Sequence, residues 1–326
     1  MMRVAVIGGG ENCEHDVSLA SAASVRSALH ARYDVVELTI GRDGRWRDAR
    51  GAALSLARAI DLLQLCAVAF PLVHGPRGED GSLAALLDFA RVPYVGSGVG
   101  AGALAMDKWA TKLIAEAVGV RTAPGGLVGV KPTYPAIVKP VAAGSSFGVS
   151  RVADATELDD AIVRAREFDD RVMVESFIEG REIDIAVLTR ADGSRMLSAP
   201  LEIVKTDALF DTAAKYDGTA DFRVPALLRP HQLDALERHA LAVYDALGCR
   251  GVARIDFFLT GTALTHNEHT DNEHADNGFV LNEVNTTPGL TAQSQVPRMF
   301  EAIGLSYEAL LDELIAAAGT TIGDAR

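Results

Sequence analysis

The 326-residue sequence has few cysteines, few aromatic residues, no excess of positive charge and no long apolar segment. Its three cysteines, Cys13, Cys66 and Cys249, are odd in number and widely spaced, which argues against a disulfide framework and against a zinc site. No apolar run approaches the length of a membrane span. We therefore expect reduced thiols and no association with a membrane.

Basic residues are outnumbered by acidic residues, 31 to 44, and the net charge is −13. A nucleic-acid backbone would be repelled on balance, so local basic residues are expected to bind something small. Residues 1–3 lead directly into an apolar strand, without the apolar core and cleavage site of a signal peptide. The expected location is the cytoplasm.

The sequence is rich in Ala, Val and Leu, and its hydrophobic content of 48% is typical of a soluble α/β protein. Between residues 3 and 96, apolar strands alternate with amphipathic helices, which predicts a parallel sheet covered on both faces. The length predicts two or three compact units. Glycines 8–10 follow the first strand, but Cys13 interrupts the Gly-x-Gly-x-x-Gly pattern, which disfavours a dinucleotide-binding dehydrogenase.

Two apolar strands near the C-terminus carry polar side chains at alternate positions. One contains Arg254 and Asp256, and the next contains Glu283 and Asn285. Side chains two apart on a strand share a face, so antiparallel pairing would gather three oxygen ligands and a guanidinium. Such oxygens suit Mg²⁺, and the guanidinium suits an oxyanion, as phosphoryl chemistry requires. The alternative is a structural hairpin whose charged side chains pair with one another on its solvent-exposed face.

Three loops also have the composition of binding loops. Glu14 lies near the start of a helix, where an acid either caps the helix dipole or holds an ammonium group. His74 opens a polar loop at the carboxyl end of a strand, where open α/β sheets bind ligands. Lys139 precedes the Gly/Ser-rich segment 142–148, whose N–H groups and hydroxyls suit phosphate oxygens. Taken alone, each loop also fits an ordinary turn.

Two segments lack an apolar pattern. Residues 206–225 have no periodicity and are expected to form a functional loop or lid. Residues 266–276 hold a duplicated polar pentapeptide with three histidines, which either binds a transition metal or is a flexible insertion. The insertion is favoured because the segment lacks apolar residues with which to build a rigid site.

Taken in order, these motifs resemble those of the D-alanine-D-alanine ligases of the ATP-grasp superfamily. The resemblance covers nearly the whole chain. It implies an α/β (α+β) fold with a Rossmann-like parallel domain at residues 1–97, a central ATP-grasp subdomain at 98–180, and a C-terminal ATP-grasp subdomain at 181–326 that carries the lid and the metal ligands. The motifs are His74-Gly75-x-x-Gly78-Glu79-Asp80-Gly81, Met106-Asp107-Lys108, Val138-Lys139-Pro140, Gly144-Ser145-Ser146-x-Gly148, Lys215-Tyr216, Arg254-Ile255-Asp256, Asn282-Glu283-x-Asn285-Thr286-x-Pro288-Gly289 and Ser294.

This resemblance implies an ATP-dependent ligase that joins two D-alanine molecules for peptidoglycan precursor synthesis. ATP phosphorylates the carboxylate of the first D-alanine, and the amine of the second attacks the acyl phosphate. The resemblance also implies two bound metal ions, either Mg²⁺ or Mn²⁺. It further implies a homodimer. The competing hypotheses are a related ligase that makes another D-alanyl dipeptide, such as D-alanyl-D-serine, or a depsipeptide, and a non-catalytic ATP-binding regulator.

The resemblance also assigns a role to each site residue. The catalytic residues are Glu14, Ser145, Tyr216 and Arg254. The amino-acid substrates are bound by Glu14, His74, Arg254, Gly289, Ser294 and Gln295. ATP is bound by Lys108, Lys139, Ser146, Glu175, Ser176, Phe177, Ile178, Glu182, Lys215 and Asn282. The metal ligands are Asp256, Glu283 and Asn285.

One departure from the family concerns the second amino acid. Gln295 follows Ser294 where the family commonly has leucine against the methyl group of the second substrate. A polar side chain tolerates an added hydroxyl, so we expect D-alanine first, D-serine as a measurable second choice, and better D-alanine selectivity in Gln295→Leu. Such a contact is worth about 1 to 3 kcal/mol.

Overall fold

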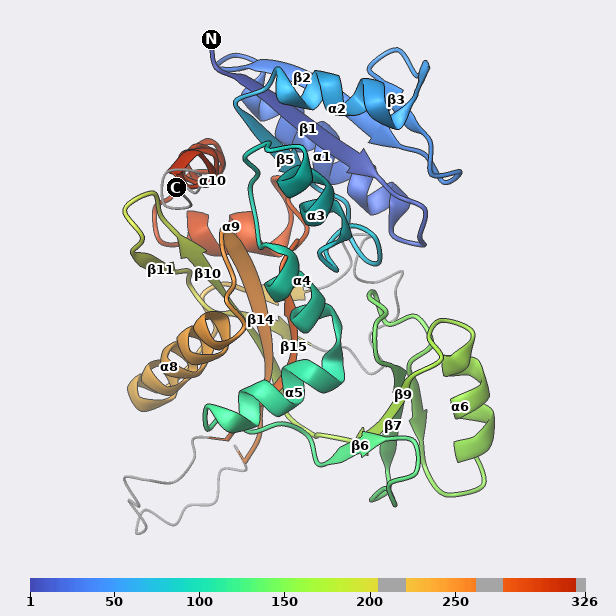
Figure 1. Ribbon diagram of the computed structural model, residues 1–326. Coiled ribbons are helices and arrows are strands. Elements are labelled where there is room, and N and C mark those ends of the chain that lie inside the picture. The colour runs from blue at the N-terminus through green and yellow to red at the C-terminus, as the bar shows by residue number, and fades with distance from the viewer. Residues whose placement is uncertain (205–220, 262–277, 321–326) are drawn as a thin grey trace.

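The computed structural model describes residues 1–204, 221–261 and 278–320, which form three sheets with helices packed around them (Figure 1). Lys215, Tyr216 and the histidine-rich segment 266–276 lie outside the described residues. No helix in the described part of the chain is both long and apolar enough to span a membrane.

The N-terminal unit is a five-stranded sheet of order β4-β3-β2-β1-β5. Its three parallel strands are β1 (Arg3–Gly9), β2 (Asp34–Ile40) and β5 (Val68–Pro71). An antiparallel extension consists of β3 (Trp46–Asp48) and β4 (Ala53–Leu54). Helix α1 (His15–Leu29) covers one face, and α2 (Leu56–Gln64) and α3 (Ser82–Phe89) cover the other. Successive side chains of β1 point to opposite faces of the sheet, so alternate residues of this strand enter the core on each face.

The central unit is a four-stranded antiparallel sheet of order β6-β9-β7-β8. Helix α6 (Leu158–Arg166) packs on this sheet through Ala161, Ile162 and Ala165. The strands are β6 (Gly125–Leu127), β7 (Ala136–Pro140), β8 (Ser150–Val152) and β9 (Val172–Ser176). The predicted Gly/Ser-rich phosphate loop therefore joins two paired strands, β7 and β8.

The third unit is a six-stranded sheet in which β13-β12-β10-β14-β15 are neighbours and β11 pairs with β10. Its strands are β10 (Arg181–Thr189), β11 (Arg195–Leu197), β12 (Leu201–Val204), β13 (Asp221–Arg223), β14 (Val252–Leu259) and β15 (Phe279–Asn285). The prediction of an irregular segment over 206–225 is wrong at its end, because residues 221–223 pair with β12. The predicted antiparallel pairing of the two ligand strands is confirmed.

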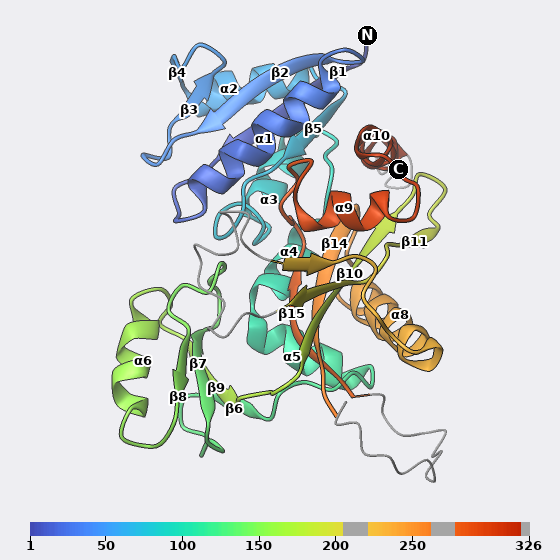
Figure 2. The ribbon, with the colours of Figure 1, turned by 180° about the vertical axis from the view of Figure 1, so that it is seen from behind.

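Helices α4 (Val99–Met106) and α5 (Lys108–Ala117) share a core with the third sheet and with α8 (Pro230–Ala246). Ala101 and Ala115 pack in the same cluster as Ile255 and Phe257 of β14. The packing of these two helices thus belongs with the C-terminal sheet, although the chain next enters the central unit (Figures 1 and 2).

Helices α9 (Gln295–Glu301) and α10 (Tyr307–Thr320) lie between the N-terminal unit and the third sheet (Figures 1 and 2). One apolar cluster contains Val6 of β1, Leu188 of β10, Met299 of α9 and Leu311 of α10. Burying this surface joins the first and third units through a continuous core.

A β-bulge at Asn282 reverses the two faces of β15. Residues 279 and 281 pair with 259 and 257, whereas Glu283 pairs with Asp256 and Asn285 pairs with Arg254. Without an extra residue, strict alternation would put Phe279, Leu281 and Glu283 on one face. The bulge lets the apolar half of the strand face the core while its polar half faces the site.

Candidate active site

The polar face of the third sheet carries a compact row of charged groups. Asp184, Asp256 and Glu283 are direct neighbours across β10, β14 and β15, and Arg254 is opposite Asn285. Asp184 has no exposed surface, and Asp256 is buried as well. Adjacent strands bring these residues together because side chains at paired positions share a face.

Arg254 is held from several directions. Its Nε and Nη2 donate to Oδ1 and Oδ2 of Asp256 at 2.7 and 2.8 Å, and its Nη1 donates to Oε1 of Gln295 at 2.7 Å. Oδ2 of Asp184 lies 3.6 Å from Nε. Burial by itself would lower the pKa of Arg254, but the carboxylates of Asp256 and Asp184 hold this pKa well above its usual value. The guanidinium is therefore a fixed positive charge with N–H groups for an oxyanion.

Asp256, Glu283 and Asn285 fit the requirements of a Mg²⁺ site. The amide nitrogen of Asn285 donates to Oδ2 of Asp256 at 3.1 Å, which leaves the amide oxygen as a ligand group. Within the described ranges, no group of three or more His, Cys, Asp or Glu side chains is arranged to bind a metal by itself. Two carboxylates and an amide nevertheless suit Mg²⁺, which usually completes its shell with water and substrate phosphates.

Lysine side chains lie beside this row and in the central unit. Nζ of Lys108 donates to the carbonyl oxygen of Ala143 at 2.6 Å and lies 3.7 Å from Oε2 of Glu283. Nζ of Lys139 is 2.5 Å from Oε1 of Glu175, and Nζ of Lys112 is 3.3 Å from Oε2 of the same carboxylate. Burial lowers the pKa of Lys112, and the charge of Glu175 opposes this effect. Glu175 thus balances two buried cations.

Glu14, at the start of α1, contacts the loop between β7 and β8 of the central unit. Oγ of Ser145 donates to Oε1 of Glu14. Added Cβ atoms at Gly75 and Gly144 would lie 2.5 and 2.7 Å from Oε2 of Glu14. These glycines permit a close approach that a larger residue would block. The structure therefore joins Glu14 and Ser145, as expected for their predicted cluster, while Tyr216 is outside the described residues.

His74 connects the N-terminal unit to the loop after β15. Its Nδ1 donates to the carbonyl oxygen of Thr287 at 2.7 Å, and its Nε2 accepts from Oγ of Ser21 at 3.2 Å. Burial lowers the pKa of His74 to about 4. Neutral imidazole meets both contacts, since one nitrogen donates and the other accepts.

Glu79 makes a second connection between the same loops. Its carboxylate accepts from the backbone N–H of Gly75 at 2.9 Å and from that of Thr287 at 3.2 Å. Burial, followed by the charge of Glu14, raises the pKa of Glu79 to about 8. This carboxyl group therefore gains a proton near neutral pH far more readily than an exposed one.

The remaining predicted residues lie around these loops. Oγ of Ser294 accepts from the backbone N–H of Thr291 at 3.1 Å, next to Gly289. Ser146 has a left-handed backbone, with φ of 60°. Segment 175–178 continues from β9 toward β10, and Glu182 pairs with Phe258 in the row next to Asp184. Asn282 is the bulge residue.

Sequence reasoning did not identify Lys112, Asp184 or Glu79 as site residues. Asp184 lies between two isoleucines in the apolar part of β10, which is a detectable signal of a buried partner. Glu79 was visible in its motif, but its partner is 208 positions away. Lys112 follows Lys108 by one helical turn, which places both on one side of α5.

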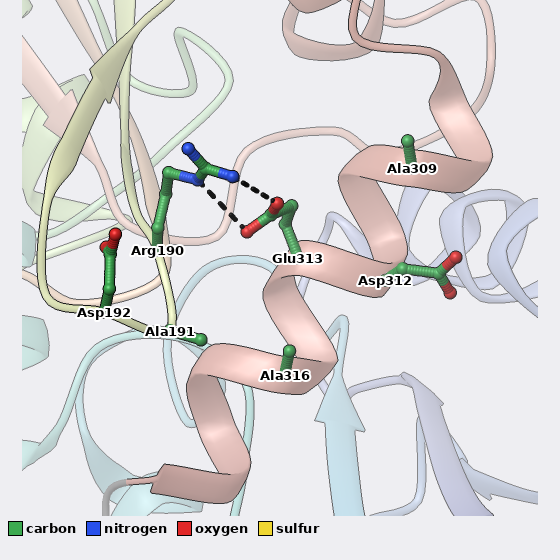
Figure 3. Close-up of a pocket in the computed structure, with 7 residues that line it drawn as sticks. All are labelled: Arg190, Ala191, Asp192, Ala309, Asp312, Glu313 and Ala316. Atoms are coloured by element: carbon green, nitrogen blue, oxygen red, sulfur yellow. Dashed lines mark hydrogen bonds and ion pairs between the residues drawn. The ribbon is translucent and has the colours of Figure 1, made fainter.

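A separate hollow of about 450 Å³ lies between the β10–β11 turn and α10 (Figure 3). The ion pair of Arg190 and Glu313 crosses it, with Nη2 and Oε1 2.8 Å apart. None of the site residues described above lines this hollow.

Family models and sequence relatives of this chain carry the same description. Residues 3–97 match the family model described as D-ala D-ala ligase N-terminus, and residues 127–316 match the one described as D-ala D-ala ligase C-terminus. The chain is 38% identical to the D-alanine--D-alanine ligase of Rhodococcus opacus, with 97% of this chain and 96% of the relative covered. It is 35% identical to that of Streptomyces coelicolor, with coverages of 97% and 92%.

Two solved structures have the same architecture. One is the VanG D-Ala:D-Ser ligase from Enterococcus faecalis, with a TM-score of 0.81, 30% identity, and 97% of this chain and 99% of that chain covered. The other is the D-alanine-D-alanine ligase from Coxiella burnetii, with a TM-score of 0.79, 29% identity, and coverages of 98% and 94%.

Proposed function

The chain belongs to the D-alanine-D-alanine ligase family, and on that premise we propose how its own residues carry out the ligation. The protein is an ATP-dependent ligase that joins two D-alanine molecules into D-alanyl-D-alanine for peptidoglycan precursor synthesis. The observation that carries the assignment of residues is the row of Asp256, Glu283 and Asn285 beside Arg254, with Lys108 next to it.

In the first step, the terminal phosphoryl group of ATP passes to a carboxylate oxygen of the first D-alanine, and ADP leaves. Carboxylate and triphosphate repel each other, so positive charge must lie between them. We assign this function to Lys108, Lys139 and Lys215, with the N–H groups around Ser146 holding phosphate oxygens. Glu14 would hold the ammonium group of the same D-alanine, because it is a buried acid at the junction of three loops.

Asp256, Glu283 and Asn285 would hold Mg²⁺, or Mn²⁺, and the expectation of two ions belongs to the same proposal. When bound, the metal neutralises charge on the phosphate oxygens. The chain itself supplies the orientation, because Asp256 is fixed by Arg254 and Asn285 before any ligand arrives.

The second step joins the two amino acids. The neutral amine of the second D-alanine attacks the acyl carbon, a C–N bond forms, the nitrogen loses one proton to water, and phosphate leaves with the C–O bond electrons. The intermediate carries a negative oxygen, for which Arg254 and the backbone N–H groups near Gly289 are suitable donors. Glu14, Ser145 and Tyr216 are the assigned cluster at the amino-acid side, where Glu14 and Ser145 are already bonded.

The nucleotide would lie between the central and third sheets. Segment 175–178 would hold adenine, Glu182 would bind the ribose, and Asn282 would face the phosphates from the bulge of β15. We propose residues 1–97, 98–180 and 181–326 as the three functional parts, with the part of 206–225 that precedes β13 as the lid that excludes water. Helices α4 and α5 lie at the start of the second part, and their apolar side chains pack in the core of the third.

We also propose a cytoplasmic homodimer, since ATP is a cytoplasmic substrate and the N-terminal unit has an exposed apolar edge. Phe89 is 91% exposed and Leu65 is 62% exposed. The C-terminal ends of α2 and α3 lie next to each other there, where Nε2 of Gln64 donates to the carbonyl oxygen of Ala90 at 3.0 Å. A second copy would cover these side chains.

The direct test is to incubate the purified chain with ATP, Mg²⁺ and D-alanine, and to measure phosphate release and product mass. We expect phosphate release that depends on D-alanine, together with D-alanyl-D-alanine. D-serine and D-lactate offered as second substrates would be poorer. ATP hydrolysis without dipeptide, or no D-alanine dependence, would contradict the ligase function and favour the regulator.

A further inference from the structure

Both polar atoms of the Gln295 carboxamide bond charged side chains. Oε1 accepts from Nη1 of Arg254 at 2.7 Å, and Nε2 donates to Oδ2 of Asp184 at 3.0 Å. Gln295 is the first residue of α9, whereas its two partners lie on neighbouring strands β10 and β14. The amide therefore bridges a helix to the polar face of the sheet.

We propose that Gln295 is a positioning residue that sets the orientation of the Arg254 guanidinium, and that it does not select the side chain of the second amino acid. The proposal rests on the function given above, in which Arg254 receives the oxyanion. It replaces the expectation that the Gln295 carboxamide meets the methyl group of the second D-alanine.

The chemistry of the three groups explains why an amide is needed at this position. Arg254 can only donate hydrogen bonds, and ionised Asp184 can only accept them. A carboxamide can accept from the first through its oxygen and donate to the second through its nitrogen at the same time. Leucine would remove both contacts, and glutamate would keep the first but place a second carboxylate against Asp184.

The position of Arg254 matters because an oxyanion is stabilised only by donors aimed at the place where its charge develops. Asp256 holds one edge of the guanidinium through Nε and Nη2. Gln295 holds Nη1, so the plane of the group is fixed from two sides. Without the second hold, the guanidinium can rotate with its Asp256 partner toward Asp184, 3.6 Å away.

The first experiment compares Gln295→Leu with the parent in steady-state kinetics, with D-alanine or D-serine as second substrate. We expect kcat to fall by about 10- to 100-fold with little change in KM, as for a misplaced catalytic group. The ratio of kcat/KM for D-alanine to that for D-serine should change by less than about twofold. Retained kcat with a clearly higher ratio would overturn the proposal. Gln293→Leu, an exposed neighbour, is the matched control and should behave like the parent.

The second experiment exchanges the amide and the acid. Gln295→Glu alone should lose activity and lower the unfolding midpoint, because a second carboxylate then faces the buried carboxylate of Asp184. The double variant Gln295→Glu/Asp184→Asn restores one acid and one amide with the hydrogen bond reversed. We expect it to recover at least about tenfold in kcat over Gln295→Glu, and to recover the midpoint. A double variant no better than Gln295→Glu would overturn the proposal.

The unfolding midpoints distinguish a failure of the proposal for Gln295 from a failure of the proposed ligase function. They report the Gln295–Asp184 coupling whatever reaction the protein catalyses, whereas a parent enzyme that makes no D-alanyl-D-alanine would contradict the proposed function alone. The reciprocal pair also answers the question if Gln295→Leu does not fold.

Discussion

The carboxylates of this site differ in their partners. Asp256 is bound by Arg254, and Glu175 lies between Lys139 and Lys112. Glu79 instead bonds two backbone N–H groups and lies near the negative charge of Glu14. Burial raises the pKa of Glu79 and the charge of Glu14 raises it further, whereas the two N–H bonds oppose these effects, so the net result favours the protonated form.

Glu79 should therefore make the substrate-free protein less stable as the pH rises. Its pKa of about 8 in the folded chain lies above the ordinary value of 4.5. The stability that this group contributes is complete below pH 4.5 and is lost progressively up to about pH 8. Thermal unfolding across this range should show a steeper fall for the parent than for Glu79→Gln. The exposed control Glu301→Gln should follow the parent, and parallel curves for parent and Glu79→Gln would contradict the assignment.

Glu283→Gln should lower kcat by about two orders of magnitude or more while leaving the unfolding midpoint close to that of the parent. The substitution keeps the shape of the side chain but removes the charge of a proposed metal ligand beside Asp256. Turnover measured across a Mg²⁺ titration checks this. Parent-like turnover at ordinary Mg²⁺ would mean that Glu283 does not bind the metal.

At the scale of elements, the bulge in β15 decides whether the site exists. Val284 lies in the same core as Phe279 and Leu281, although its position has the opposite parity. The sequence contains this signal, because apolar residues at 279 and 281 are followed by polar ones at 283 and 285. Simple alternation predicted that Glu283 and Asn285 share one face of β15. It did not predict that the bulge before Glu283 exchanges the two faces of the strand.

Deleting Asn282 should prevent stable folding, since strict alternation would bring either Glu283 and Asn285 into the core or Phe279 and Leu281 out of it. Asn282→Ala is the matched control, because it keeps the extra residue. We expect it to fold with a midpoint near that of the parent and to bind ATP less tightly. Soluble expression and unfolding midpoints of the two variants check this. A deletion variant as stable as Asn282→Ala would show that the strand can shift its register without cost.

At the scale of the whole molecule, the exposed edge formed by Leu65 and Phe89 leads to a prediction about assembly. Phe89→Asp should convert the proposed dimer to monomers, because it places a charge in the centre of an apolar contact. Val163→Asp places the same charge at another exposed apolar side chain, on α6 of the central unit, and should leave the assembly unchanged. Sedimentation velocity distinguishes the two. A monomeric parent, or a dimer that survives Phe89→Asp, would contradict the proposed interface.

The fold class and the partners on adjacent strands could be predicted because both follow from local periodicity. The period of two gave the faces of β14, and the alternation of strands and helices gave the N-terminal sheet. The partners of Gln295 could not be predicted in this way. Gln295 and Asp184 are 111 positions apart, and one lies on a helix while the other lies on a strand. Only the packing of α9 on the third sheet brings them into contact.

The loop after β15 has a consequence for recombination between related genes. Thr287 is bound by His74 and Glu79, and Leu290 donates its N–H to Ser21, so this C-terminal loop is built against side chains encoded near the start of the gene. A crossover after residue 97 would separate these partners, even though it falls between two units. Chimeras that exchange the first 97 residues together with loop 286–290 should therefore yield active enzymes more often than those that exchange the first segment alone.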